Sequence, residues 1–256
     1  MLDVKRIRED FDNVKKAVES RKLGDFGIDN VLVYDKKRRE LLAEVEQMKN
    51  KQSVSSKQIP KMKKEGQDTT ELMAEMKALS EKIKVLDAEV GEVEAKLRET
   101  LLNIPNTPYK DVQEGEDDSA NVELRKWGEP REFDFEQKAH WDIGTDLDIL
   151  DFERAAKISG TRFTVYKGLG ARLERSVINF MLNLHTEEHG FKEILPPFMV
   201  NRDAMTGTGQ LPKFEDDMFH VPAKDFFLVP TAEVPLTNLR MNEIIDADSL
   251  PIYYTA

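Results

Sequence analysis

Apolar residues recur at alternating three- and four-residue steps through two long stretches of the chain, 31–59 and 72–97. The first seam becomes polar toward its end. It consists of Val31, Tyr34, Arg38, Leu41, Val45, Met48, Gln52, Ser55 and Ile59. The second seam consists of Leu72, Met76, Leu79, Ile83, Leu86, Val90, Val93 and Leu97. An apolar repeat of 3.5 residues is typical of coiled-coil helices. Because only a short polar turn at 66–70 separates the stretches, the pattern predicts an antiparallel helical hairpin.

Further signals delimit this hairpin. An amphipathic pattern over 3–20 predicts a short helix before it. Each arm of about 35 residues is expected to be about 50 Å long. Pro60 lies near the tip and is expected to kink or locally open the first arm. The prolines and asparagines of 101–109 end the second arm, and we expect a domain boundary near residue 105.

The remainder of the chain, 106–256, has shorter elements and predicts a domain of mixed α and β structure. Helical patterns occur at 148–158 and from residue 169 onward, and Gly190 is suited to end the second helix. Strands are predicted at 162–166, 191–200, 218–221 and 226–229. Because the second of these contains a Pro-Pro pair, it is expected at a sheet edge or a subunit contact. An antiparallel sheet packed on helices is favoured.

Composition narrows the function classes. The 256 residues include no cysteine, which excludes a disulfide scaffold and a thiolate zinc site and fits a reducing cytoplasm. No run of about 18 apolar residues occurs, so neither a membrane-spanning helix nor a membrane partner is expected. The net charge of −11 argues against general coating of nucleic acid but not against a local basic patch.

A local basic patch lies in the distal half of the first arm, where no acidic residue occurs between Lys49 and Lys64. Its members are Lys49, Lys51, Lys57, Lys61, Lys63 and Lys64. Such a stripe on an acidic protein suggests contact with the phosphates of a polyanion. Because no aromatic residues are interleaved, shape and backbone recognition is favoured over base readout. A structural or dimerising coiled coil with a solvated lysine face explains the same pattern.

Two short motifs suggest chemistry that a simpler explanation also covers. His185 and His189 in HTEEH fit the H-x-x-E-H pattern of a zinc peptidase, but histidines are also favourable in the last turn of a helix. The GTGQ sequence at 207–210 is too short for a nucleotide-binding loop, and we interpret it as a flexible loop that could cover a pocket. His140 and His220 are isolated and are expected to be structural.

The segment VPTAEVPL, 229–236, places the carboxylate of Glu233 among apolar and small residues. A buried, unpaired carboxylate is costly, so Glu233 is expected either at the surface or beside a cation. The functional interpretation is a pocket in which Glu233 binds an ammonium group and the Thr231 hydroxyl adds a contact. The flanking prolines would preorganise this backbone. The simpler interpretation is the end of a strand with a surface glutamate.

In combination, these segments resemble bacterial seryl-tRNA synthetases, which are class II aminoacyl-tRNA synthetases. The basic hairpin is followed in order by HGFKEILPPFMV, GTGQLPKF and VPTAEVPL, so the resemblance extends along the whole chain. HGFKEILPPFMV is similar to motif 1 of that class, which implies that Pro197 lies at a dimer interface. VPTAEVPL is similar to the serine-binding TxE signature. This implies that Thr231, Ala232 and Glu233 line the serine pocket and that Glu233 meets the α-ammonium group.

The resemblance also implies a fold, an activity and partners. It implies an α+β chain, with a tRNA-binding coiled-coil arm at 1–105 and part of a class II antiparallel-sheet domain at 106–256. A cytoplasmic homodimer would use ATP and Mg²⁺ to form seryl-adenylate and would transfer serine to serine tRNA, whose long variable arm the hairpin contacts; no DNA partner is expected. The ATP-binding arginines are expected beyond Ala256, so the chain alone is expected to make no adenylate.

Two other classes stay open. One is a non-catalytic coiled-coil module that binds nucleic acid or protein. The other is a zinc peptidase that uses His185 and His189.

Overall fold

A computed structural model describes the backbone of residues 1–256 and every side chain except that of Lys63. The chain divides into two compact units, Met1–Arg125 and Lys126–Ala256. In the part of the chain that is described, no helix is long and apolar enough to cross a membrane.

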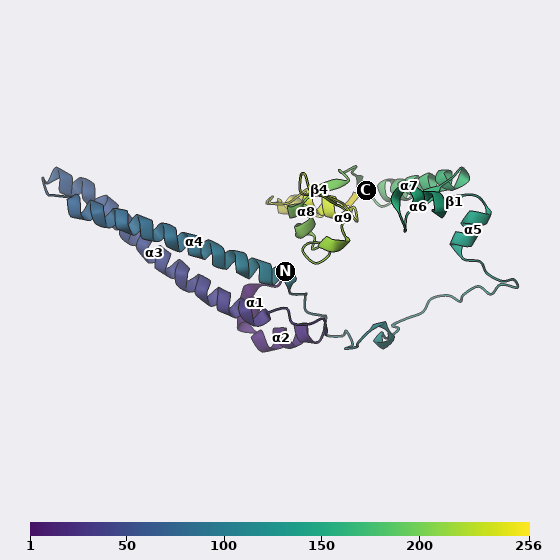
Figure 1. Cartoon of the computed structure of the whole chain (residues 1–256), viewed down its shortest axis with the longest axis horizontal. Helices are drawn as coiled ribbons and strands as arrows, with labels where there is room; N and C mark the ends of the chain where they lie inside the picture. Colours follow the sequence, from purple (N-terminus) through teal and green to yellow (C-terminus); the bar gives the residue numbers. More distant parts are fainter. The chain divides into compact units, whose positions relative to one another are not determined.

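The first unit is dominated by two long helices, α3 (Ile28–Lys64) and α4 (Thr70–Asn103). They lie side by side as an antiparallel hairpin, with the turn at the end remote from the shorter helices of the unit (Figure 1). Gly66 in the turn has a φ of +70°, a conformation that glycine adopts without a steric penalty. The predicted hairpin is therefore confirmed, with arms of 37 and 34 residues.

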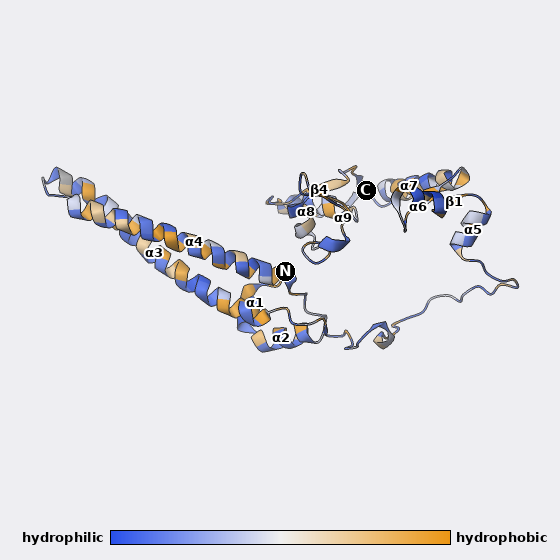
Figure 2. Cartoon of the chain, viewed as in Figure 1, coloured by the Kyte–Doolittle hydropathy of each residue, from blue (hydrophilic) through white to orange (hydrophobic). Residues whose placement is uncertain are grey.

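Burial along the hairpin follows the predicted seams. The buried seam residues are Val31, Val45, Ile83, Leu86, Val90, Val93 and Leu97. Near the turn, the seam positions Gln52, Ser55 and Ile59 are only half-buried. Figure 2 shows apolar residues recurring along both helices between hydrophilic ones. Apolar burial thus weakens toward the tip, where the sequence replaces aliphatic residues by polar ones.

Pro60 lies inside α3, and the helix continues as an α-helix to Lys64. A proline removes one hydrogen bond of the helical ladder and crowds the carbonyl of the preceding turn. Because α3 ends about one turn later, few hydrogen bonds depend on this position. Pro60 therefore does not end the helix.

The segment predicted as one helix over 3–20 forms two, α1 (Val4–Glu9) and α2 (Phe11–Glu19). Asp10 separates them with a non-helical backbone (φ −136°, ψ 47°), and its carboxylate accepts a hydrogen bond from the Asn13 side chain. The single-helix prediction was wrong because the apolar period continues across this break. The break lets Ile7 and Val14 pack in one core at the base of the hairpin, together with Val31.

A buried carboxylate fixes α1 against the hairpin. Asp35 is 3% exposed, and it accepts hydrogen bonds from Arg8 Nη1 of α1 and Arg39 Nε of α3, each at 3.0 Å. A buried charge requires such partners, because its desolvation is otherwise uncompensated. Asp35 lies outside the apolar seam, so the repeat gave no signal for it.

Two valines on opposite faces of α3 test the importance of the base core. Val31 is fully buried and Val33 is 61% exposed. We expect Val31→Ala to lower the free energy of unfolding by about 2 kcal/mol, because it removes buried methyl groups and leaves a cavity. Val33→Ala, the matched control, should change it by less than about 0.5 kcal/mol. Urea unfolding of both variants measures the difference, and equal values would contradict this packing.

The second unit begins with α5 (His140–Asp146) and a two-stranded antiparallel pair, β1 (Leu150–Asp151) with β2 (Val165–Tyr166). The helix predicted at 148–158 starts later, as α6 (Phe152–Ser159). Asp151 explains the difference, because it pairs in β1 and its side chain caps α6 by accepting from the Arg154 N–H. That backbone hydrogen bond is also the main reason why the pKa of Asp151 is lowered.

The long helix α7 (Leu169–Glu187) is followed by Gly190, which has a φ of +69° as expected for a residue that ends a helix. Most of its large apolar side chains are exposed in this chain. The exposed members are Leu169, Leu173, Val177, Phe180 and Met181. This face is a large uncovered apolar surface, which in soluble folds marks an interaction site.

A three-stranded antiparallel sheet has the order β4 (Met199–Asn201), β6 (Phe226–Leu228), β5 (His220–Val221). The strand predicted over 191–200 is interrupted around its Pro-Pro pair, because proline cannot donate to a ladder. Its last part, β4, is an edge strand, as expected for that segment. A second pairing was not predicted: β3 (Lys192–Glu193) pairs in parallel with β7 (Tyr254–Thr255). The short helix α8 (Arg202–Gly207) packs on the three-stranded sheet, and α9 (Glu233–Asn238) packs on α8 and shares a core with Phe227 of β6.

The short elements of the second unit share one core. Its buried members are Ala204, Met205, Leu211, Phe227 and Val234. Three single-turn 3₁₀ helices complete the described structure, η1 (Asp118–Ala120), η2 (Glu215–Asp217) and η3 (Ala247–Ser249). The core joins the GTGQLPKF loop to α9, which begins at Glu233.

Candidate functional site

A groove of about 210 Å³ lies between the segments 193–196 and 229–232. Thr231 and Ala232 line it, together with apolar side chains such as Phe198. Glu193 also lines it and supplies a carboxylate that the sequence analysis did not single out. The groove is therefore mainly apolar with a few polar groups at defined positions, as small-molecule sites usually are.

Glu233 is the first residue of α9 and lies directly beside this groove in the sequence, but it is not among the lining residues. Its N–H donates to the Thr231 hydroxyl at 3.3 Å, and the next residue, Val234, is fully buried. The Glu233 side chain is exposed, and no described side chain forms an ion pair with it. The carboxylate is thus held at a fixed backbone position and is available to a cation.

The GTGQLPKF loop starts against α9. The Asn238 amide nitrogen donates to the carbonyl oxygens of Ala204 at 2.9 Å and Val234 at 2.8 Å, which ties α8 to α9. A Cβ on Gly207 would lie 2.6 Å from the Asn238 side-chain oxygen, so only glycine fits here without displacing that side chain. The start of the loop is therefore in direct contact with Asn238 at the end of α9.

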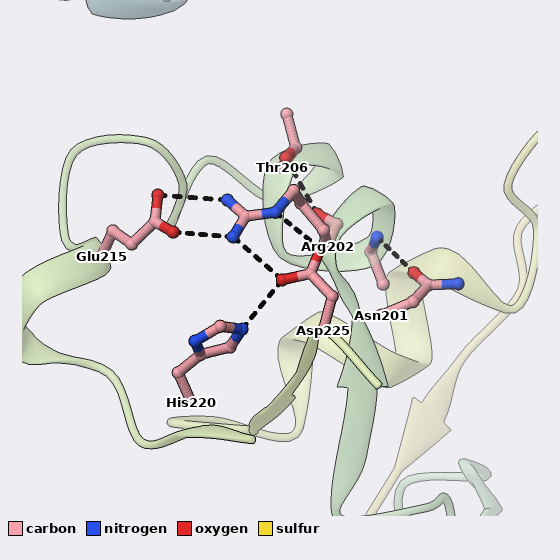
Figure 3. Close-up of polar contacts among 7 residues, drawn as sticks. Asn201, Arg202, Thr206, Glu215, His220 and Asp225 are labelled. Carbon is pink, nitrogen blue, oxygen red and sulfur yellow. Dashed lines mark hydrogen bonds and ion pairs between the residues drawn. The ribbon is translucent and has the colours of Figure 1, made fainter. Parts of the chain in front are cut away.

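Three charged or titratable side chains form a network around Arg202, the first residue of α8 (Figure 3). The guanidinium donates to both oxygens of Asp225, with Nε at 2.8 Å and Nη2 at 3.0 Å. It also donates to both oxygens of Glu215, with Nη2 at 2.7 Å and Nη1 at 3.1 Å. His220 Nε2 lies 2.8 Å from Asp225 Oδ1. These are two fork-like carboxylate pairs, the geometry for which arginine is suited.

The ion pairs shift the pKa values of Arg202, Glu215 and Asp225 in the directions expected for charge pairing. Hydrogen bonds from Arg202 and then from His220 lower the pKa of Asp225 to about 2. Arg202 likewise lowers the pKa of Glu215. The same two carboxylates raise the pKa of Arg202. The charged forms of Arg202, Glu215 and Asp225 are therefore favoured.

Acid should weaken this network in a defined window. The folded pKa of Asp225 lies below its ordinary value of 3.8, so its stabilising contribution is present above that value and is lost as pH falls toward 2. We expect the melting temperature of Asp225→Asn to lie below that of the parent chain by a constant amount at neutral pH, and the gap to shrink below about pH 4. Thermal scans across pH measure this, with Asp216→Asn as an exposed control. A gap that widens in acid would contradict the pairing.

The six lysines predicted to bind a polyanion fall into different environments. Lys49 donates to Asp87 at 3.0 Å and Lys51 to Glu75, so both pair with carboxylates of α4. Lys57, Lys61 and Lys64 are exposed, and none forms an ion pair with a described side chain. The side chain of Lys63 lies outside the described residues. The cations that are free to meet phosphates are therefore those nearest the tip.

The two histidines of HTEEH interact with each other. Their Nδ1 atoms lie 3.1 Å apart, and both rings pack against Phe191. Among the described residues, no group of three or more His, Cys, Asp or Glu side chains could hold a metal ion. Pro197, the predicted motif 1 proline, is exposed between β3 and β4.

Comparison with known proteins gives the chain a context. Residues 1–108 match the family described as the seryl-tRNA synthetase N-terminal domain. Over 256 residues the chain is 62% identical to the serine–tRNA ligase of Alkaliphilus oremlandii, and over 259 aligned residues it is 54% identical to that of Clostridium tetani. Along its whole length, the chain is similar to seryl-tRNA synthetases. It spans 60% and 61% of the lengths of these two relatives.

Solved structures of seryl-tRNA synthetases also match. The crystal structure from Pyrococcus horikoshii, complexed with ATP, has a TM-score of 0.83 and 30% identity, and the match covers 99% of this chain and 62% of that one. The cytoplasmic serine–tRNA ligase from Naegleria fowleri, in complex with AMP, has a TM-score of 0.75, with 99% of this chain and 63% of that one covered. At 21% identity, this second match shows the fold alone.

These comparisons confirm the resemblance identified from the sequence motifs. They also confirm the predicted fold class, a long helical arm followed by part of a class II synthetase-like antiparallel-sheet domain with flanking helices. The family match ends at residue 108, whereas the compact units divide after Arg125. The expected domain ranges, 1–105 and 106–256, stay predictions.

Sequence reasoning missed two features. The Arg202 network joins residues 13 to 23 positions apart that no repeat relates. A signal for it was the acidic run Glu215–Asp217, which directly follows GTGQLPKF. A groove of about 580 Å³ between α2 and residues 107–115 was also missed. Its charged lining residues are Lys16, Arg21, Lys110 and Glu114.

Proposed function

We propose that this chain provides the RNA-binding arm and part of the catalytic region of a seryl-tRNA synthetase. The whole protein would activate serine with ATP in the presence of Mg²⁺, release pyrophosphate, and transfer serine to the 3′ end of serine tRNA in the cytoplasm. The observation that carries this proposal is the 62% identity to a serine–tRNA ligase over all 256 residues. Catalysis would depend mainly on positioning and on neutralising phosphate charge.

The proposed serine site consists of Thr231, Ala232 and Glu233. Glu233 would bind the α-ammonium group through a charge-assisted hydrogen bond, and the small side chain of Ala232 would leave room beside it. The partner-free carboxylate of Glu233 and the groove along Thr231 and Ala232 support this assignment. Anchoring of α9 through buried Val234 would hold the carboxylate in place.

The proposal places neither ATP nor Mg²⁺ on residues of this chain. The described carboxylates and histidines form no group of three or more that could hold a metal ion. No arginine lines the serine groove. The phosphate-binding groups would therefore come from residues outside this groove.

The proposed RNA surface is the distal part of α3. Lys57, Lys61 and Lys64 would meet the phosphates of serine tRNA, with Lys63 beside them in the sequence. Lys49 and Lys51 would contribute only if their ion pairs with α4 opened. The hairpin carries these charges far from the base core, which suits recognition of RNA shape.

The proposed dimer contact includes Pro197. Its exposure, and the exposed apolar face of α7, support a homodimer in which both are covered by a second copy.

Serine-dependent exchange between ATP and pyrophosphate tests the proposed function. We expect the native gene product to catalyse this exchange and to charge serine tRNA, and threonine to replace serine poorly. A gene product that binds tRNA but shows no exchange with any amino acid would instead support the non-catalytic interaction module.

A further inference from the structure

Arg202 connects three segments that are separate in the sequence. Arg202 is the first residue of α8. Glu215 is the first residue of η2, the 3₁₀ turn that follows the GTGQLPKF loop, and Asp225 lies in the turn between β5 and β6 (Figure 3). Four hydrogen bonds from one guanidinium fix these segments relative to each other. Asp225 also has a φ of +50°, so the turn depends on a conformation that few residues adopt readily.

The network rests on the ring of Phe227. The Arg202 guanidinium lies 5.1 Å from the ring centroid, and the His220 ring stacks on the same side chain with a centroid distance of 4.5 Å. Phe227 is fully buried, and its core partners include Leu211 of the GTGQLPKF loop and Val234 of α9. The Phe227 ring therefore contacts the charged network on one side and belongs to the same buried core as Val234 of α9.

The exposure of the network argues for positioning over stability. The side chains of Arg202, Glu215 and Asp225 are 40%, 42% and 50% exposed. Exposed ion pairs usually contribute little to the free energy of unfolding. Two parallel hydrogen bonds between the guanidinium and a carboxylate do, however, restrict the relative orientation of the two side chains, because both planar groups must align. A lysine offers one point charge and cannot reproduce this alignment.

We propose that Arg202 is a positioning residue for amino-acid recognition. It holds the GTGQLPKF loop and the β5–β6 hairpin in register with α9, so that serine binding at Thr231 and Glu233 depends on a side chain that does not touch the ligand. This inference rests on the proposed function of the same site. It adds a residue for which the sequence motifs gave no role.

The test uses serine-dependent ATP–pyrophosphate exchange by the native gene product. We expect Arg202→Gln to raise the KM for serine by about tenfold or more, because small displacements of a binding site are costly. The KM for ATP should stay within about twofold, because the contacts described for the network are with Glu215 after the GTGQLPKF loop, Asp225 in the β5–β6 turn and the Phe227 ring. Arg175→Gln, which makes the same charge change at an exposed position of α7, should leave both values unchanged.

Two further variants test the route of the effect. Glu215→Gln retains the Arg202–Asp225 pair and should raise the serine KM by less than Arg202→Gln does. In the double variant, Glu215→Gln should add little to Arg202→Gln, because the two residues act through one contact. Hydrogen exchange of the 256-residue chain should show faster exchange at amides 207–214 in Arg202→Gln and not in Arg175→Gln.

The outcomes separate this inference from the proposed function. Absence of serine-dependent exchange in the parent protein would remove the proposed function. Exchange in the parent with an unchanged serine KM in Arg202→Gln would remove the inference alone. If Arg202→Gln fails to fold, the serine KM of Glu215→Gln is the deciding measurement, because that variant keeps the Arg202–Asp225 pair. An unchanged serine KM in Glu215→Gln then overturns the inference.

Discussion

Replacing Lys57, Lys61 and Lys64 together by glutamate is expected to weaken binding of serine tRNA on the order of 10²-fold. The structure leaves these three side chains exposed and without ion-pair partners among the described residues. An exposed charged contact contributes up to about 1 kcal/mol, so loss of three contacts amounts to roughly two orders of magnitude in affinity. Filter binding or fluorescence anisotropy at fixed salt measures the change.

The salt dependence of binding provides a second readout for the same variant. Each phosphate contact releases about 0.7 to 0.9 counterion, so the slope of log affinity against log salt should become shallower by about 2 to 3. Shape-dependent contacts elsewhere on the hairpin do not change this slope. A weaker affinity with an unchanged slope would indicate that the variant distorts the tip and does not remove phosphate contacts.

A matched control removes the general effect of added negative charge, which matters because the chain already carries a net charge of −11. Lys157, Lys192 and Lys224 are exposed lysines of the second unit, and none of them forms an ion pair with a described side chain. Replacing these three by glutamate makes the same change in charge. If this control weakens binding as strongly as the tip variant, the tip lysines are only a solvated face.

Lys49 and Lys51 show what charge counting along a sequence leaves out. Both belong to the basic stripe, yet each faces a carboxylate of α4, as Arg38 faces Glu94. Such half-exposed pairs contribute little to stability, but they favour one register of the hairpin over others. The sequence contains both partners, but their pairing depends on how the two arms align.

The hairpin was predictable because its main driving force is local and periodic. Burial of Val45, Leu86 and Val90 follows directly from the repeat. The break at Asp10 was not predictable in this way, because an apolar period can continue across two helices that both face one core. The apolar repeat in the sequence thus identifies which helix face is buried, but it does not identify every helix end.

The second unit was less predictable because its contacts join distant segments. The parallel pairing of β3 with β7 and the Arg202 network each connect residues that no repeat relates. At VPTAEVPL, the simpler interpretation expected a strand end with a surface glutamate; Glu233 is exposed, but a helix, α9, begins there. Pro235 fits this short helix because a proline in the first turn loses no helical hydrogen bond. The assignment of Glu233 to the serine ammonium group stays a prediction.

Replacing Glu233 by glutamine is expected to raise the KM for serine in ATP–pyrophosphate exchange on the order of 10²-fold. Glutamine keeps the size of the side chain but removes the charge that would pair with the ammonium group. A hydrogen bond to a charged group contributes about 1.5 to 3 kcal/mol, which corresponds to roughly 10- to 150-fold. The native gene product is the material for this measurement, and its melting temperature should change little because Glu233 is exposed.

Glu193 is the matched control, because it is a second carboxylate and lines the same groove. If the ammonium group pairs with Glu233, then Glu193→Gln should leave the serine KM within about threefold of the parent value. A change of ligand tests the same pairing from the other side, because glycerate carries a hydroxyl where serine carries its ammonium group. The parent protein should bind serine more tightly than glycerate, and Glu233→Gln should lose most of this difference in affinity. A strong loss in Glu193→Gln with no loss in Glu233→Gln would move the cation site to the other wall of the groove, and the TxE assignment would then be wrong for this chain.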